Sequence, residues 1–284
     1  MPFKSDELYK AYLKYIEFKK NNPAPFHDRY IFPLLAGSYF AYRKVDVMRI
    51  VAIAKSLSST PRYLDVGCGY GDFLEKIREF IPTASGIEKD GNIFYIFQKE
   101  KPDYIHIGDI ENFVGQFDLI FVGWMDPGVD FRKHVTKHTN CIVTTFDEGG
   151  QCGLNGACDY EEFGFNRIAW WFTPSWIDVN HQLMNKYYTK INMDIRKQLF
   201  ELRSAHNVWH VYTRDGVSKA VYKGLKSWIE REFKLSLFNE KFDFETILDM
   251  CGFNYSVRIP KTTENRVMWD VKFDYESSTR NVGE

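Results

Sequence analysis

The stretch from Tyr63 to Leu74 constrains the fold of this chain most, because a β-rich run leads into a glycine-rich turn and then into a helical pattern. Glycines at positions 67, 69 and 71 can take positive φ and let the backbone approach a ligand closely. The apolar residues after the turn recur at helical spacing and would pack the next helix onto a sheet. The sequence therefore predicts a strand, a turn and a helix that bind a nucleoside-bearing cofactor.

The spacing of the three glycines separates two classes of cofactor site. A dinucleotide-binding turn has the pattern Gly-x-Gly-x-x-Gly and places a pyrophosphate at a helix N-terminus. Here the pattern is Gly-x-Gly-x-Gly, and Asp72 takes the place of the last dinucleotide glycine. A carboxylate beside a pyrophosphate would be unfavourable, whereas Asp72 together with Asp65 suits a cationic ligand.

This turn resembles the first motif of the class I S-adenosylmethionine-dependent methyltransferases. The resemblance implies S-adenosylmethionine as the cofactor, with S-adenosylhomocysteine as the product. It also implies that the turn formed by Gly67, Gly69 and Gly71 passes under the methionine part of the cofactor, and that Asp65 faces its ammonium group.

Two further short apolar segments end in acids, in the order that the resemblance requires. Glu88 follows the turn by about twenty residues and would accept hydrogen bonds from both ribose hydroxyls. Asp109 and Ile110 close the next segment and would lie beside the adenine. Residues 117–124 then read as a fourth strand. The resemblance thus implies an α/β, Rossmann-like, seven-stranded and mostly parallel sheet with helices on both faces.

The same pattern divides the chain into five parts. We expect an N-terminal helical extension, a cofactor-binding half of the core, a helical and aromatic insertion or cap that faces the substrate, the last helix and two strands of the core, and a polar tail. Their predicted ranges are 1–60, 61–150, 151–242, 243–275 and 276–284.

The last two core strands are expected close to the end of the chain. Tyr255–Ile259 reads as the sixth strand and Arg266–Asp274 as the seventh. In the family, the last strand runs antiparallel to the others, and a hairpin-like connection permits that arrangement here.

The predicted fourth and fifth strands each lead into a candidate acceptor-binding loop, at the sheet edge where open α/β folds bind ligands. Trp124 and Asp126 follow the fourth strand, and Glu148 follows the fifth. Amino-group methyltransferases have Asp/Asn-Pro-Pro-aromatic here, and Asp126-Pro127 matches its first two residues. Asp126 is predicted to anchor the substrate or act as a base, and Glu148 to orient an acceptor or take its proton. The alternative for both acids is a solvated turn.

His206 and His210 lie on one face of a segment that alternates like a strand. They are candidate substrate-binding residues. The alternative is a structural role, in which each ring is hydrogen-bonded within the protein.

Net charge, hydropathy and cysteine content limit the substrates and the cellular location that are expected for this protein. A net charge of −1 and a pI near 6.7 disfavour a broad electrostatic grip on nucleic acid and favour a small-molecule or peptide-like substrate. No run is long and apolar enough to cross a membrane, and the polar start lacks a signal-peptide pattern, so a cytoplasmic protein is expected. The five cysteines fit reduced thiols. Cys152 and Cys158 are read as ordinary thiols, with no bound metal.

The predicted activity is methyl transfer to a nucleophile by in-line displacement. Because sulfonium is a good leaving group, alignment and desolvation would supply most of the rate, and no conspicuous catalytic constellation is required. Three alternatives stay open: a nucleic-acid methyltransferase, an aminopropyl or aminocarboxypropyl transferase with the same cofactor, and a non-catalytic scaffold with the methyltransferase fold.

Overall fold

The computed structural model describes most of the predicted core. The described residues are Glu17, Lys20 and the ranges 44–96, 98–123, 125–147, 152–173, 207–234 and 270–275. The chain divides into two compact units, and nearly all described residues belong to the unit made of Lys44–Trp171, Val208–Phe238 and Val271–Glu284. The predicted N-terminal extension, apart from the helix that begins at Lys44, and the predicted strand Tyr255–Ile259 lie outside the described residues.

Strands and helices alternate along the first half of the described chain, as a doubly wound α/β fold requires. The helices are α3 (Lys44–Leu57), α4 (Asp72–Arg78), α5 (Asn92–Ile96), η1 (Ile110–Asn112), α6 (Arg132–Val135), η2 (Glu161–Phe163) and α9 (Asp215–Lys234). The strands are β1 (Tyr63–Val66), β2 (Ser85–Glu88), β3 (Ile105–Ile107), β4 (Leu119–Gly123), β5 (Cys141–Asp147), β6 (Asn166–Thr173), β7 (Asn207–Thr213) and β8 (Lys272–Phe273).

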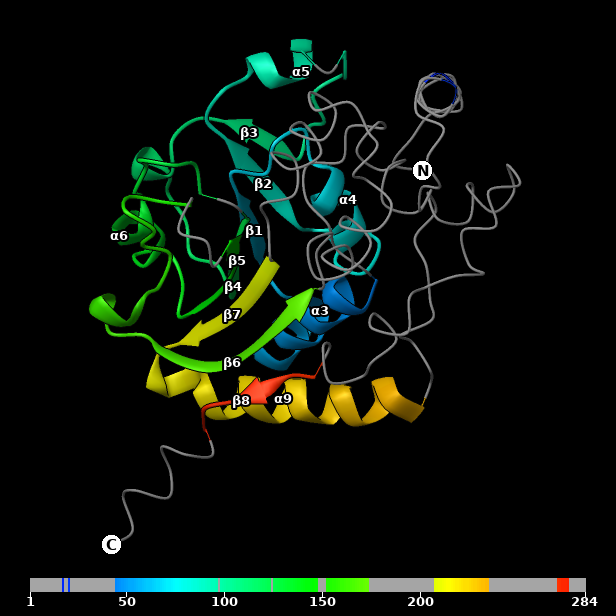
Figure 1. The fold of residues 1–284 in the computed structure, drawn as a ribbon, viewed down its shortest axis with the longest axis vertical. Helices are drawn as coiled ribbons and strands as arrows, with labels where there is room; N and C mark the ends of the chain where they lie inside the picture. The colour runs from blue at the N-terminus through cyan, green and yellow to red at the C-terminus, as the bar shows by residue number, and fades with distance from the viewer. Residues whose placement is uncertain are drawn as a thin grey trace, which may run out of the picture. The chain divides into compact units, whose positions relative to one another are not determined.

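The eight strands form one sheet in the order β3-β2-β1-β4-β5-β7-β6-β8 (Figure 1). β1 pairs in parallel with β2 and β4, β2 with β3, and β4 with β5. The order 3-2-1-4-5 is that of the Rossmann fold, and the chain reverses its direction of travel across the sheet between β1 and β4. The predicted Rossmann-like α/β fold is confirmed, with eight described strands in place of seven.

The other half of the sheet corrects the predicted strand assignment. β6 and β7 come from the range predicted to be an insertion or cap, yet they continue the main sheet beyond β5. The backbone N–H of Arg214, just after β7, donates to Asn140 O, just before β5, so β7 runs antiparallel to β5. Of the predicted strand Arg266–Asp274, only Lys272–Phe273 is a described strand, and it pairs antiparallel with β6 at the edge.

Aromatic composition explains this error. The run Asn166–Thr173 is rich in Trp and Phe, which is compatible with the predicted aromatic cap, but aromatic residues equally favour strands. α9, from the same range, lies against α3. The closeness of the two helices shows at Gly224, where an added Cβ would collide with Ser56 Cβ.

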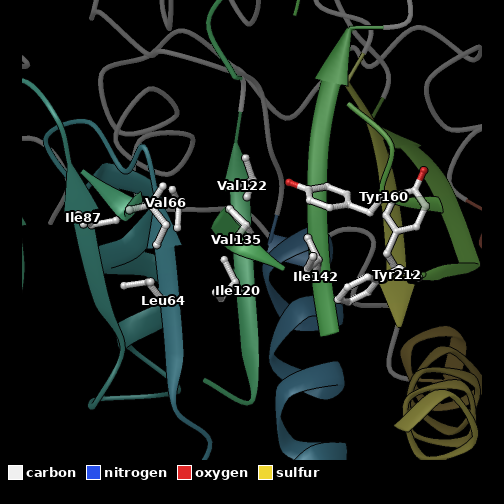
Figure 2. Packing of buried hydrophobic residues seen from close by; sticks show 11 residues of the cluster. Leu64, Val66, Ile87, Ile120, Val122, Val135, Ile142, Tyr160 and Tyr212 are labelled. Carbon is white, nitrogen blue, oxygen red and sulfur yellow. The ribbon is translucent and has the colours of Figure 1, made fainter. Parts of the chain in front are cut away.

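Two apolar layers cover the sheet. Figure 2 shows one of them, in which branched side chains of β1, β2, β4 and β5 pack with Val135 of α6, Tyr160 and Tyr212. On the other face, Phe121 of β4 contacts Phe73 of α4 and Trp209 of β7, with ring centroids 4.8 and 5.7 Å apart. Figure 1 accordingly shows α6 on one side of the parallel strands and α3 and α4 on the other. The side chains of each strand alternate between these layers.

Candidate functional site

The glycine-rich turn connects the carboxyl end of β1 to α4. Gly67, Gly69 and Gly71 all have positive φ, at +73°, +57° and +89°. The N–H groups of Gly67 and Cys68 both donate to Ile87 O, at 2.9 and 3.2 Å. These bonds hold the turn against the end of β2, at the point where the strand order reverses and open α/β sheets bind their ligands.

The glycines of this region have two different roles. The two roles can be distinguished by asking which atoms a Cβ placed on each glycine would contact. Among the described residues, a Cβ at Gly67 would meet nothing within 4 Å, and a Cβ at Gly69 would meet only Ile93 Cδ1, at 3.6 Å. At Gly71 it would lie 2.6 Å from Ile105 Cδ1, and at Gly86 it would lie 2.6 Å from Cys68 Sγ. Gly71 and Gly86 therefore permit internal packing, whereas a Cβ at Gly67 or Gly69 would collide with none of the described residues.

Three carboxyl groups surround the turn. Burial, followed by the charges of Asp72 and Glu88, raises the pKa of the Asp65 carboxyl well above its usual value. Burial is also the largest cause that raises the pKa of Asp72, to about 6. Since Asp65 and Asp72 are desolvated, a cation placed beside them would restore their ionisation. The region thus favours a positively charged ligand.

Glu88 connects the end of β2 to the turn. Its Oε2 accepts a hydrogen bond from Gly69 N–H at 2.9 Å, and its Oε1 accepts one from Asp90 N–H at 3.0 Å. A carboxylate offers about four lone-pair positions, so each oxygen can accept a further bond from a ligand hydroxyl. The two backbone bonds fix the orientation of this carboxylate.

Asp109 lies in the loop after β3 and caps η1. Its Oδ1 accepts from Glu111 N–H at 3.1 Å, and its Oδ2 lies 2.7 Å from Lys89 Nζ. The hydrogen bond from Lys89 is the largest cause that lowers the pKa of Asp109. Ile110, predicted to bind the cofactor, has its side chain in the apolar core. A contact between Ile110 and a ligand would have to use its backbone.

The turn after β4 carries one of the two predicted catalytic acids. Asp126 is exposed, and its carbonyl accepts a hydrogen bond from Val129 N–H at 3.1 Å. Gly153 N–H donates to Met125 O at 3.0 Å, and Gly128 N–H donates to Gly153 O at 2.9 Å. The turn is therefore bonded to the loop that follows β5. Trp124 and Glu148 lie outside the described residues.

His210 lies on β7 with its ring packed inside the protein. The ring contacts Phe146 edge to face, with centroids 4.9 Å apart, and Nδ1 lies 3.0 Å from the Tyr212 hydroxyl. Burial, and secondly the charge of Arg167, lowers the pKa of His210 to about 3. The imidazole is therefore neutral near pH 7. His206, its predicted partner, lies outside the described residues.

Sequence reasoning missed two features near the site. The first is Lys89, which follows the predicted ribose acid directly and reaches Asp109. The second is the association of Cys152 with Cys158, whose thiols share a hydrogen bond. An acid followed by a lysine could have suggested the first, whereas the second depends on a loop conformation that spacing does not encode. Among the described residues, no three His, Cys, Asp or Glu side chains are grouped to hold a metal.

Comparisons with known proteins give similarity at the level of structure. No protein-family model matches the chain, and a search of curated proteins finds no match. Among solved structures, the chain is similar to the magnesium protoporphyrin IX methyltransferase of Synechocystis PCC 6803 with bound SAM, at 11% identity and a TM-score of 0.39, covering 61% of this chain and 79% of that one. It is also similar to the N-methyltransferase NodS of Bradyrhizobium japonicum WM9, at 13% identity and a TM-score of 0.40, covering 60% and 93%.

A third similar structure is the plantazolicin methyltransferase BpumL in complex with SAH, at 14% identity and a TM-score of 0.32, covering 59% and 84%. All three are methyltransferases, the class that the glycine-rich turn resembles. At these identities and TM-scores, the strand order and the turn geometry remain the basis for the fold and the site. Within the described residues, no helix is long and apolar enough to cross a membrane.

Proposed function

We propose that the protein is a methyltransferase that uses S-adenosylmethionine. The observation that supports this most is the uncrowded backbone of Gly67 and Gly69 among the described residues, next to Asp65, Asp72 and Glu88, where the strand order reverses. A ligand that fits there must lie close to the backbone of the turn. It also needs hydroxyl groups that donate to the Glu88 carboxylate, and a positive charge. S-adenosylmethionine has all three, with a ribose, an ammonium group and a sulfonium.

Different residues around the turn would bind different parts of this cofactor. Asp65 and Asp72 would lie on the cationic methionine part, and Glu88 would accept from the ribose hydroxyls while keeping its two backbone bonds. Asp109 would receive the adenine amino group after the Lys89 ammonium moves aside. When bound, the cofactor supplies an electrophilic methyl group.

The proposed acceptor is a small molecule or a peptide-like group. Asp126 is exposed on the turn after β4 and can anchor such a group or take its proton, and Trp124, Glu148, His206 and His210 remain proposed contributors. His210 would act only as a neutral residue, because its pKa is lowered to about 3. The net charge of −1 supports an acceptor other than nucleic acid.

Isothermal calorimetry with S-adenosylmethionine and S-adenosylhomocysteine tests this proposal. We expect micromolar binding by the wild type and a loss of at least tenfold in Glu88→Ala and in Gly69→Asn. Asn tolerates the left-handed backbone that Gly69 adopts, so this variant adds a side chain to the turn with little strain. Gly216→Val is the matched control, because Gly216 lies on α9 and a Cβ there meets nothing within 4 Å.

If the folded wild type bound neither ligand, the proposal that S-adenosylmethionine is the cofactor would be wrong. The proposed methyltransferase activity would then be wrong as well. If binding holds, the mass of the product formed with a panel of acceptors identifies the transferred group. A methyl group supports the proposal, whereas an aminopropyl or aminocarboxypropyl group would contradict it.

A further inference from the structure

Two cysteine thiols lie against each other in the loop after β5. Cys152 and Cys158 are 2% and 3% exposed and form a small cluster with Met125, which packs against Phe131 and Phe146. A side-chain hydrogen bond joins the two thiols. Both cysteines are reduced in this structure. The two side chains therefore lie together in one packed cluster.

The loop between them is closed by its own backbone. Leu154 and Ala157 form an antiparallel bridge, and Ala157 N–H donates to Leu154 O at 3.1 Å. Gly153 has a φ of +67°, and a Cβ there would collide with Ala157 O and lie 3.3 Å from Cys158 Sγ. The absence of a side chain at Gly153 is what lets the two arms of the loop, and hence the two sulfurs, come together.

We propose that Cys152 and Cys158 are a disulfide-forming pair, which a small disulfide such as oxidised glutathione converts to an intramolecular bond. One cysteine thiolate attacks a glutathione sulfur, forms a mixed disulfide and releases one glutathione thiolate. The other cysteine thiolate attacks the mixed disulfide at the cysteine sulfur and releases the second glutathione. The two cysteines are oxidised, the glutathione disulfide is reduced to two thiols, and the two cysteine protons pass to the released thiolates.

The environment of the two cysteines determines the rate of disulfide formation. The hydrogen bond from Cys152 and burial both raise the pKa of the Cys158 thiol, so little thiolate is present at neutral pH. The burial of both sulfurs also requires the loop to open before glutathione can reach them. We therefore expect slow formation at pH 7, with a rate that rises up to about tenfold per pH unit.

The bond would act on the loop that carries Asp126. Gly153 is hydrogen-bonded to Met125 O and to Gly128 N–H, on either side of Asp126. A sulfur–sulfur bond of about 2.05 Å is much shorter than a thiol–thiol hydrogen bond, so the arms of the loop must shift as it forms. This shift passes directly to the turn after β4. The inference does not depend on the proposed function.

The test uses the full chain. The protein is incubated with oxidised glutathione at pH 7.0 and 8.5, quenched in acid, alkylated in denaturant and digested without reduction for mass spectrometry. We expect a peptide pair cross-linked through Cys152 and Cys158, lighter by about 2 Da than the reduced peptides. Cys68 and Cys141, which are buried elsewhere, should be recovered alkylated.

Two variants sharpen the result. Cys158→Ser should stop at a glutathione adduct on Cys152, whereas the matched control Cys141→Ser should keep the cross-link. Full alkylation of Cys152 and Cys158 in the wild type would overturn the proposal. So would glutathione adducts without a cross-link, or a disulfide that joins either cysteine to another partner. The wild-type measurement decides the matter even if a variant fails to fold.

Discussion

Two ion pairs of equal length lie in contrasting environments of this protein. Arg49 and Glu232 connect α3 and α9 with an N···O distance of 2.7 Å, and both side chains are 0% exposed. Lys89 and Asp109 lie at the ends of β2 and β3 with the same distance, but Lys89 is 80% exposed. The first pair is closed off from water, and the second can be separated at little cost because water replaces each partner. Burial, not distance, decides which pair the fold depends on.

The contrast extends to the neighbouring groups. Beside the first pair, Trp171 Nε1 donates to Asp46 Oδ1 at 2.9 Å, and Arg49 lies over the Trp171 ring. Asp46, Trp171, Arg49 and Glu232 are thus engaged with one another. Around the glycine-rich turn, by contrast, burial and the charges of Asp72 and Glu88 raise the pKa of Asp65. The buried polar groups between α3 and α9 are engaged within the protein, whereas the carboxyl ends of β1 and β2 are where we propose that a ligand binds.

The largest expected effect comes from breaking the buried pair. Glu232→Ala should lower the free energy of unfolding by about 3–5 kcal/mol, because Arg49 is left as a buried charge without its carboxylate. Urea denaturation followed by tryptophan fluorescence measures this change. The double variant Arg49→Met, Glu232→Leu is the control and should recover most of the loss. A loss below about 1 kcal/mol in Glu232→Ala would mean that water reaches the pair.

A smaller effect is expected from removing charge beside the turn. Asp72→Asn should stabilise the protein by about 2 kcal/mol at pH 7, because the raised pKa of Asp72 disfavours its ionised form. The sign follows from linkage. The folded-state pKa of about 6 exceeds the usual 3.8, so the stability from protonated Asp72 is complete below about pH 4 and lost as pH rises through 6.

Urea denaturation of both proteins at pH 4, 5, 6 and 7 checks this prediction. The variant should gain nothing at pH 4 and reach its full gain by pH 7. The exposed acid Glu100 provides the control, as Glu100→Gln should show no such pH-dependent difference. A constant difference across the range would show that Asp72 is not the titrating group.

The smallest effect is expected from breaking the exposed pair. Lys89→Ala should leave the melting temperature unchanged, because water solvates both partners, but the pKa of Asp109 should rise toward its usual value. Carboxyl ¹³C NMR titration of Asp109 measures the shift, with Lys55→Ala on α3 as the control. An unchanged pKa of Asp109 would mean that its bond from Glu111 N–H, not Lys89, is the main influence.

Much of the parallel half of the sheet could be predicted from the sequence. The strand predicted over residues 117–124 is observed at Leu119–Gly123, because buried parallel strands are short apolar runs bounded by turn residues. The distribution of acids at strand ends was also readable. The sequence does not show that Gly71 is crowded while Gly67 and Gly69 meet no close described neighbour, because the crowding of Gly71 comes from Ile105 on another strand.

The antiparallel half could not be predicted in the same way. Asn166–Thr173 and Asn207–Thr213 pair with strands that are distant in sequence, and their periodicity alone does not say which sheet they join. The position of Glu88 at the end of β2 could be predicted from the sequence, and its role in binding stays a prediction, whereas the environment of His210 could not be predicted. Its neutral state results from burial in tertiary packing.

The order of strands in the sheet has a consequence for the synthesis of this chain. β5 ends at Asp147, but the strand that covers its free edge, β7, begins only at Asn207, so 59 residues lie between them. At about 5–20 residues per second, a ribosome needs roughly 3–12 seconds to cover that interval. During this time the apolar run of β5 has an unpaired edge, and such edges recruit other strands. Nascent chains of this protein should therefore depend on chaperones until residue 213 has emerged.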